Sequence, residues 1–227
     1  MSNIHNLYST LNGISFFNIV GVGNFPSDYF PIDLSINSKL IKNLDLTNSS
    51  EMELLINQYL KKNKSKVAYG GYLENRNLYQ RSDYFNSRDE NERTIHLGID
   101  FWCAAGTSVF APLDGIIHSF QYNTNFGDYG PTIILSHVLE GIVFYTLYGH
   151  LSLDSLEELQ VGKQIKKGDK VAFLGDSSIN GNYAPHLHFQ LILDMQGKLG
   201  DYPGVCAKNE VDFYQSNCPN PLFLLGL

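Results

Sequence analysis

Hydrophobic residues in the second half of the chain come in short runs separated by turns. From Thr94 onward these runs alternate with dipeptides such as Gly-Asp, Asp-Gly and Gly-Asn, and this spacing is typical of antiparallel β-strands. The pattern therefore predicts a mainly β fold class, built on an antiparallel β-sheet. We expect strands over residues 108–111, 115–122, 132–137, 142–148, 170–174 and 186–193, and one short helix over 154–159.

The part of the chain before Thr94 has a different pattern. Residues 1–48 are irregular and contain prolines in turn contexts. Ser50 and Glu53 have the spacing of a capping box, and apolar residues follow at helical intervals. We therefore expect three regions. The first is an irregular N-terminal extension over residues 1–90, with one amphipathic helix at about 50–62. The second is a β-domain over 91–200, and the third is an apolar C-terminal strap over 201–227 that packs on the domain.

Charge and hydropathy narrow the classes of function. The chain has 227 residues, a formal net charge of −7 and a pI of about 5.4. Nucleic acid is an unlikely partner for such a protein, because phosphate neutralisation requires a basic face. No apolar run is long enough to cross a membrane, so we expect no membrane insertion. The N-terminus lacks the basic region and cleavage site of a signal peptide, which favours a cytoplasmic location.

The three cysteines do not suggest a disulfide framework. Cys103, Cys206 and Cys218 are odd in number and form no Cys-x-x-Cys pair, so reduced structural thiols are the favoured interpretation. A bond between Cys206 and Cys218 is the open alternative. Cys103 has no basic partner nearby in the sequence, and we expect a small core residue rather than a nucleophile.

Histidines carry the candidate chemistry. His186 and His188 flank a leucine in a predicted strand, so both point to the same face. His96 lies four residues before Asp100, and His150 follows the end of another strand. Two histidines and one aspartate would leave the fourth position of a tetrahedral zinc ion open for water, which is the arrangement of a catalytic site. The alternative is a pair of solvent-facing histidines on an edge strand.

Three motifs resemble the signatures of the lysostaphin/LytM-type zinc endopeptidases. They are His96-x-x-x-Asp100, Tyr148-Gly149-His150-Leu151 and Pro185-His186-Leu187-His188-Phe189, and the likeness extends over about residues 94–193. The resemblance implies a duplicated-hybrid-motif fold, in which a small antiparallel sheet lines a groove with zinc on its floor. It also implies that His96, Asp100 and His188 bind the zinc, and that His150 and His186 are catalytic.

The function that this resemblance implies is hydrolysis of a peptide bond in peptidoglycan or in a glycine-rich or D-amino-acid peptide, by a zinc-activated water and two catalytic histidines. The partner expected is a peptide or a peptidoglycan fragment. Weaker sequence similarities point to a subgroup of this family that occurs in larger fusion proteins with a kinase-like and an aminotransferase-like domain. Two alternatives are open, a cytoplasmic metallohydrolase of a small amide or dipeptide-like metabolite and a non-enzymatic regulatory module. The module is disfavoured because all five motif positions are filled.

Several features do not fit the family pattern or have no expected role. Gln190 stands where the family commonly has Glu, and the loop over residues 175–184 is longer than usual. The segment Tyr69–Arg76 is either part of the groove rim or a surface loop. Four further residues are expected to be structural or to lie in ordinary turns, namely His118, His137, Asp128 and Asp201.

Overall fold

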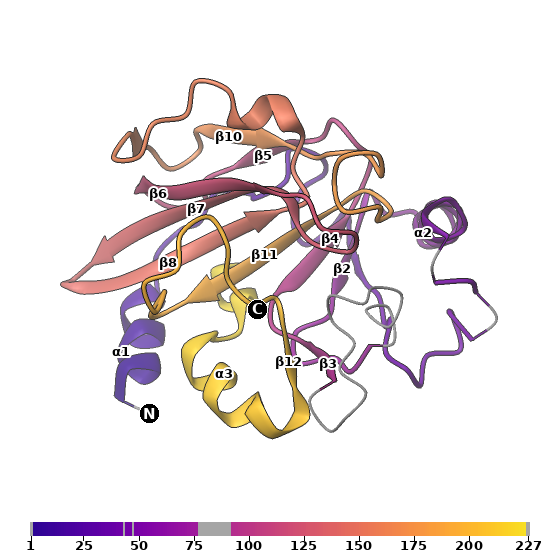
Figure 1. The fold of residues 1–227 in the computed structure, drawn as a ribbon, viewed down its shortest axis with the longest axis horizontal. Helices are drawn as coiled ribbons and strands as arrows, with labels where there is room; N and C mark the ends of the chain where they lie inside the picture. The colour runs from indigo at the N-terminus through magenta and orange to yellow at the C-terminus, as the bar shows by residue number, and fades with distance from the viewer. Residues whose placement is uncertain (1, 43, 47, 77–91, 226–227) are drawn as a thin grey trace.

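A curved antiparallel sheet forms the body of the protein. The computed structural model describes residues 2–42, 44–46, 48–76 and 92–225. In this part of the chain eight strands form one sheet in the order β1-β2-β4-β11-β8-β7-β6-β9 (Figure 1). The mainly β fold class expected from the sequence is confirmed.

The centre of the sheet is a run of antiparallel strands. They are β4 (Ile99–Trp102), β11 (His186–Ile192), β8 (Ile142–Gly149), β7 (Gly130–Leu139), β6 (Gly115–Asn123) and β9 (Gln164–Ile165). Every residue of β11 is buried. Its Leu187, Phe189 and Leu191 enter the main hydrophobic core, whereas the alternate positions His186 and His188 face the other side of the sheet.

Two small sheets accompany the large one. β5 (Ser108–Phe110) pairs with β10 (Lys170–Phe173), and β3 (Arg93–His96) pairs with β12 (Val205–Ala207). The short helix expected after β8 is the 3-10 helix η2 (Leu153–Leu156). It ends three residues earlier than the sequence suggested, because Glu157 is already extended.

The N-terminal region contributes strands to the sheet, which its irregular sequence did not indicate. β1 (Tyr29–Pro31) pairs in parallel with β2 (Val67–Gly70), and β2 is antiparallel to β4. Both strands are too short for an alternating pattern to stand out. A further helix, α1 (Ser2–Leu11), packs Leu7 and Leu11 into the main core.

The helix α2 (Ser49–Asn63) lies beside β2 at one end of the sheet (Figure 1). Its N-cap is Asn48, whose side chain accepts hydrogen bonds from the backbone N–H groups of Ser50 and Glu51. The capping box expected at Ser50 and Glu53 is therefore wrong by two residues, since Asn48 is an equally good cap. Met52 and Ile56 are buried against a cluster that contains Trp102.

The C-terminal segment folds back over the body of the protein. It contains η3 (Lys208–Glu210), α3 (Val211–Asn217) and η4 (Pro221–Leu225). Leu224 is buried in the main core, and Phe223 stacks on Tyr8 of α1. Cys206 and Cys218 are buried and free, as is Cys103. No helix in the described part of the chain is both long and apolar enough to span a membrane.

Candidate metal centre and active site

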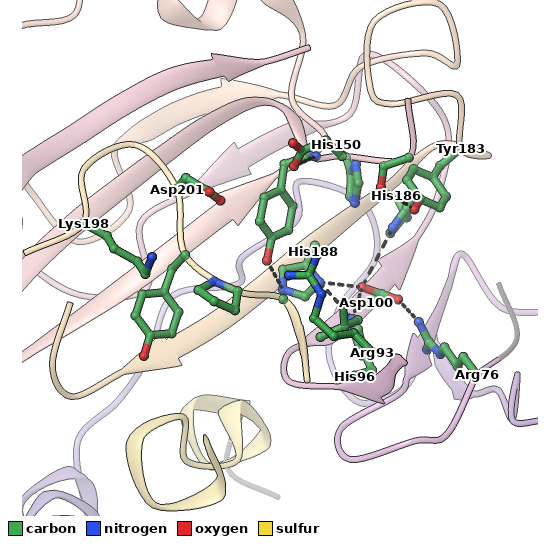
Figure 2. Close-up of a pocket in the computed structure, with 17 residues that line it drawn as sticks. Arg76, Arg93, His96, Asp100, His150, Tyr183, His186, His188, Lys198 and Asp201 are labelled. Atoms are coloured by element: carbon green, nitrogen blue, oxygen red, sulfur yellow. Dashed lines mark hydrogen bonds and ion pairs between the residues drawn. The ribbon is translucent and has the colours of Figure 1, made fainter. Parts of the chain in front are cut away.

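Three side chains from neighbouring strands converge at one point of the sheet. His96 ends β3, Asp100 lies in β4, and His188 lies in β11 directly opposite Asp100. His96 Nε2 is 2.9 Å from His188 Nδ1, and each of these nitrogens is 3.3 Å from Asp100 Oδ1 (Figure 2). The β4–β11 register and the short turn at Gly98 thus bring distant parts of the sequence together.

Gly98 makes this close approach possible. It lies between the two motif residues His96 and Asp100, against the ring of His188. A Cβ atom built there would lie 2.6 Å from His188 Nε2 and 2.8 Å from the carbonyl oxygen of Phe189. Any larger residue would therefore push His188 away from its partners.

The triangle of donor atoms fits a tetrahedral metal ion. Zinc bonds to nitrogen and carboxylate oxygen of about 2.0–2.2 Å place adjacent tetrahedral ligands about 3.3–3.6 Å apart. The observed separations of 2.9, 3.3 and 3.3 Å are close to that spacing. Asp100 Oδ1 is buried and accepts no hydrogen bond within the described residues. A buried carboxylate oxygen without a donor is costly, and a cation at this point would compensate it.

The other polar atom of each of these three residues is held by the protein. His96 Nδ1 donates to the carbonyl oxygen of Gly71 over 3.0 Å, and His188 Nε2 donates to Gln190 Oε1 over 3.0 Å. Asp100 Oδ2 accepts a hydrogen bond from Arg76. These contacts leave His96 Nε2, His188 Nδ1 and Asp100 Oδ1 directed at the common point, as carboxylate- and carbonyl-supported ligands are in known metal sites.

Two further histidines lie beside this cluster. Nδ1 of His150 donates to the carbonyl oxygen of Asn180, and Nδ1 of His186 donates to that of Ala184, each over 2.8 Å. Their ring centroids are 4.2 Å apart, and His186 Nε2 is 3.9 Å from Asp100 Oδ1. Because Nδ1 carries the proton in both rings, the lone pair of each is on Nε2. The site thus contains two potential proton acceptors.

Burial sets the protonation of the site. It lowers the pKa of His96 and the pKa of His186 to about 4, and together with the neighbouring His186 and His188 it holds the pKa of His150 well below its usual value. Burial alone would raise the pKa of Asp100, but electrostatic interactions with His96, Arg76 and His186 outweigh burial and hold this pKa well below the ordinary range. An anionic carboxylate among neutral imidazoles is the state that binds a metal.

All five side chains that the motifs indicated line one pocket, so the structure brings the sequence-predicted residues together. Asp128 and Asp201 also line this pocket, a position that the turn-rich sequence around them did not indicate. His118 and His137 do not line it. Tyr129 also lines the pocket, although no pattern in the sequence indicated it, because its contact with His188 spans 59 positions of sequence.

The segment Tyr69–Arg76, for which two interpretations were open, borders the site directly. Gly71 and Arg76 contact His96 and Asp100 respectively. Gly71 has a φ of +108°, and a Cβ there would lie 2.9 Å from His96 Nδ1 and collide with the guanidinium of Arg76. Only glycine combines this backbone angle with the close contact.

Comparisons with known proteins match this part of the chain. The model of the peptidase family M23 matches residues 94–199. An uncharacterized metalloprotease of Haemophilus influenzae is 35% identical over 95 residues, which are 42% of this chain and 18% of that protein. The DD-carboxypeptidase/endopeptidase Mpg of Neisseria meningitidis is 32% identical over 102 residues, 45% of this chain and 21% of that protein. The chain thus matches only about a fifth of the length of these curated relatives.

Solved structures include similar domains. The catalytic domain of lysostaphin from Staphylococcus simulans is 27% identical with a TM-score of 0.38, over 54% of this chain and 80% of that one. A zinc-containing peptidase from Vibrio cholerae is 27% identical with a TM-score of 0.35, over 43% of this chain and 27% of that one. The family match contains His96, Asp100, His150, His186 and His188. Residues 94–199 of this chain are therefore similar to peptidase family M23.

Proposed function

We propose that this protein is a zinc-dependent metallopeptidase that hydrolyses a peptide bond, with His96, Asp100 and His188 as the zinc ligands. The observation that carries the proposal is the convergence of three buried ligand atoms around Asp100 Oδ1, which accepts no hydrogen bond within the described residues. Zinc with three protein ligands supplies Lewis-acid polarisation of the scissile carbonyl and a water whose pKa is lowered to about 7.

The two remaining histidines perform the proton chemistry. His150 and His186 each keep Nδ1 on a backbone carbonyl, so Nε2 is the atom that exchanges protons with the pocket. One ring accepts the proton of the attacking water, and the other stabilises the charge that develops on the carbonyl oxygen. Their lowered pKa values keep both rings neutral, and therefore able to accept a proton, at neutral pH.

The substrate class follows from the relatives together with the pocket. The relative from Neisseria meningitidis is named as a DD-carboxypeptidase/endopeptidase. Another relative, from Vibrio cholerae and 26% identical over 100 residues, is named as a peptidoglycan DD-endopeptidase. The pocket of this chain is lined by side chains of both signs of charge, which include Arg93, Lys198 and Asp201 (Figure 2). We therefore propose a peptide of peptidoglycan as the substrate, because such peptides carry both carboxylates and amines.

The test is a digest of peptidoglycan fragments. Zinc-loaded protein is incubated with cross-linked and uncross-linked fragments, with oligoglycine and with small dipeptides, and the products are identified by mass spectrometry. The proposal predicts cleavage of peptidoglycan peptides by the wild type and none by His150→Ala. If only the dipeptides were cleaved, the substrate would be a small amide and not a peptide of peptidoglycan. A zinc-loaded, folded wild type that cleaves none of these substrates would contradict the enzymatic proposal.

A further inference from the structure

A buried chain of charged side chains reaches the metal-binding aspartate from outside the family domain. Arg76 precedes residue 94, where the family match begins. Its side chain is only 1% exposed, and its guanidinium donates to Glu74 Oε2 through Nε and to Asp100 Oδ2 through Nη1. Glu74 Oε1 in turn accepts a hydrogen bond from the backbone N–H of Leu34 over 3.0 Å. The chain of contacts therefore begins in the N-terminal region and ends on a metal ligand.

The backbone of the same segment fixes Arg76 in this place. The N–H of Arg76 donates to the carbonyl oxygen of Thr94 over 2.9 Å, and the N–H of His96 donates to that of Glu74 over 3.0 Å. Asn75 forms a β-bridge with Ile95. These bonds run alongside β3 and hold the backbone of Arg76 beside the strand that ends at His96.

The contact decides which oxygen of Asp100 is available. Arg76 occupies Oδ2, which leaves Oδ1 as the atom 3.3 Å from both His96 Nε2 and His188 Nδ1. Glu74 balances the charge of Arg76, so the guanidinium adds no net positive charge beside a cation. A planar guanidinium that binds two carboxylates at once orients both more rigidly than an ammonium group.

We propose that Arg76 is a positioning residue of the metal centre, which fixes Asp100 as a one-oxygen ligand and thereby raises the affinity for zinc. This inference rests on the proposed zinc centre and extends it to a residue outside residues 94–199. It also means that the N-terminal segment at Gly71–Arg76 is part of the site and that the family domain alone lacks one support of its metal ligand.

The experiment measures metal binding by the full chain. Metal-free wild type, Arg76→Met and Arg76→Lys are titrated with zinc in competition with a chromophoric chelator, and circular dichroism monitors the fold. Loss of a hydrogen-bonding partner of a metal ligand typically weakens binding about 10- to 100-fold. We expect this loss for Arg76→Met and a smaller one for Arg76→Lys, because lysine keeps the charge but cannot hold Glu74 and Asp100 together.

Cobalt provides a readout that a purely structural role would not change. Cobalt(II) bound in place of zinc absorbs strongly in the visible when four-coordinate and weakly when its coordination number rises. Release of Oδ2 in Arg76→Met lets Asp100 bind through both oxygens, so we expect a weaker visible band. Lys66→Met is the matched control, since it breaks an ion pair with Asp28 at a lysine that is 56% exposed and should leave zinc affinity and the cobalt band unchanged.

The outcomes separate this inference from the proposed function. Folded Arg76 variants with wild-type zinc affinity and an unchanged cobalt band would overturn the inference, and so would loss of the fold in both variants with and without zinc. A wild type that binds no zinc would overturn the proposed function and the inference together. A wild type that binds zinc but hydrolyses no peptide would overturn the proposed function alone.

Discussion

The buried histidines fall into two groups, those of the proposed metal centre and His137 in β7, and the groups differ in one respect. His137 in β7 is buried, and burial lowers its pKa to about 4, as for His96 and His186. Both of its nitrogens are hydrogen-bonded within the protein, however. Nδ1 donates to the carbonyl oxygen of Asp114 over 2.7 Å, and Nε2 accepts from Thr146 Oγ1 over 2.8 Å.

In the proposed metal centre, one nitrogen of each ring is directed at a common point instead. His96 and His188 are each fixed through one nitrogen, while the other nitrogen faces Asp100 Oδ1. Burial and a depressed pKa therefore do not by themselves distinguish a functional histidine from a structural one. The distinguishing feature is a set of polar atoms from different strands that converge on one point.

The largest difference between the two groups should appear in zinc affinity when a proposed metal ligand is removed. We expect His188→Ala to lower zinc affinity more than about 100-fold, beyond the usual effect of losing a ligand's hydrogen-bonding partner, and to abolish hydrolysis. Zinc titration and the peptidoglycan digest check this outcome. His137→Gln is the matched variant of a buried histidine and should bind zinc like the wild type. Equal zinc binding by wild type and His188→Ala would remove His188 from the centre.

A smaller but still large loss should follow from removing a catalytic histidine. His150→Ala keeps all three ligands, so we expect zinc binding within a few-fold of wild type and turnover lower by about 100- to 10,000-fold, the usual contribution of a proton-transferring group. Steady-state rates on zinc-saturated protein provide the measurement. Undiminished turnover in the variant would exclude His150 from the mechanism.

His137 should affect stability instead of catalysis. Replacing it with Gln weakens hydrogen bonds to buried partners, which costs about 1–3 kcal/mol in the free energy of unfolding. Chemical denaturation measures this loss, and turnover per zinc-loaded molecule should stay the same. A loss of turnover as large as that of His150→Ala would show that burial, not position in the pocket, is what matters.

The pH dependence of stability gives a finer test of the same residue. The pKa of His137 is about 4 in the folded protein and about 6.5 when exposed, so the unfolded state binds the extra proton between these values. This contribution to stability is full above pH 6.5 and is lost as the pH falls towards 4. The free energy of unfolding of the wild type should therefore depend more steeply on pH in this range than that of His137→Gln. Parallel profiles would contradict the lowered pKa.

The smallest effect is expected for the thiols, which are buried and are not among the described residues that line the pocket. Burial raises the pKa of Cys103, Cys206 and Cys218 to about 12, so a thiol reagent at neutral pH should label none in the native protein and all three after denaturation. Reductant should leave the unfolding temperature unchanged. If the reagent labelled only one thiol in protein denatured without reductant, the other two cysteines would be joined in a disulfide.

The sequence contained most of the site, because its main signals are local. The alternation of β-strands places His186 and His188 on one face, and the four-residue spacing of His96 and Asp100 fits a tight turn at Gly98. The support from Arg76 depends instead on how β2, β3 and β4 come together, and no local pattern encodes that arrangement. The strands β1 and β2 were likewise missed because each has at most four residues.

The most direct test of the account is a crystal structure of zinc-soaked protein, with anomalous scattering recorded on both sides of the zinc absorption edge. We predict one strong anomalous peak within bonding distance of His96 Nε2, Asp100 Oδ1 and His188 Nδ1, with a solvent oxygen in the fourth position. A peak elsewhere, no peak, or a fourth protein atom in place of the solvent would contradict the proposed catalytic centre.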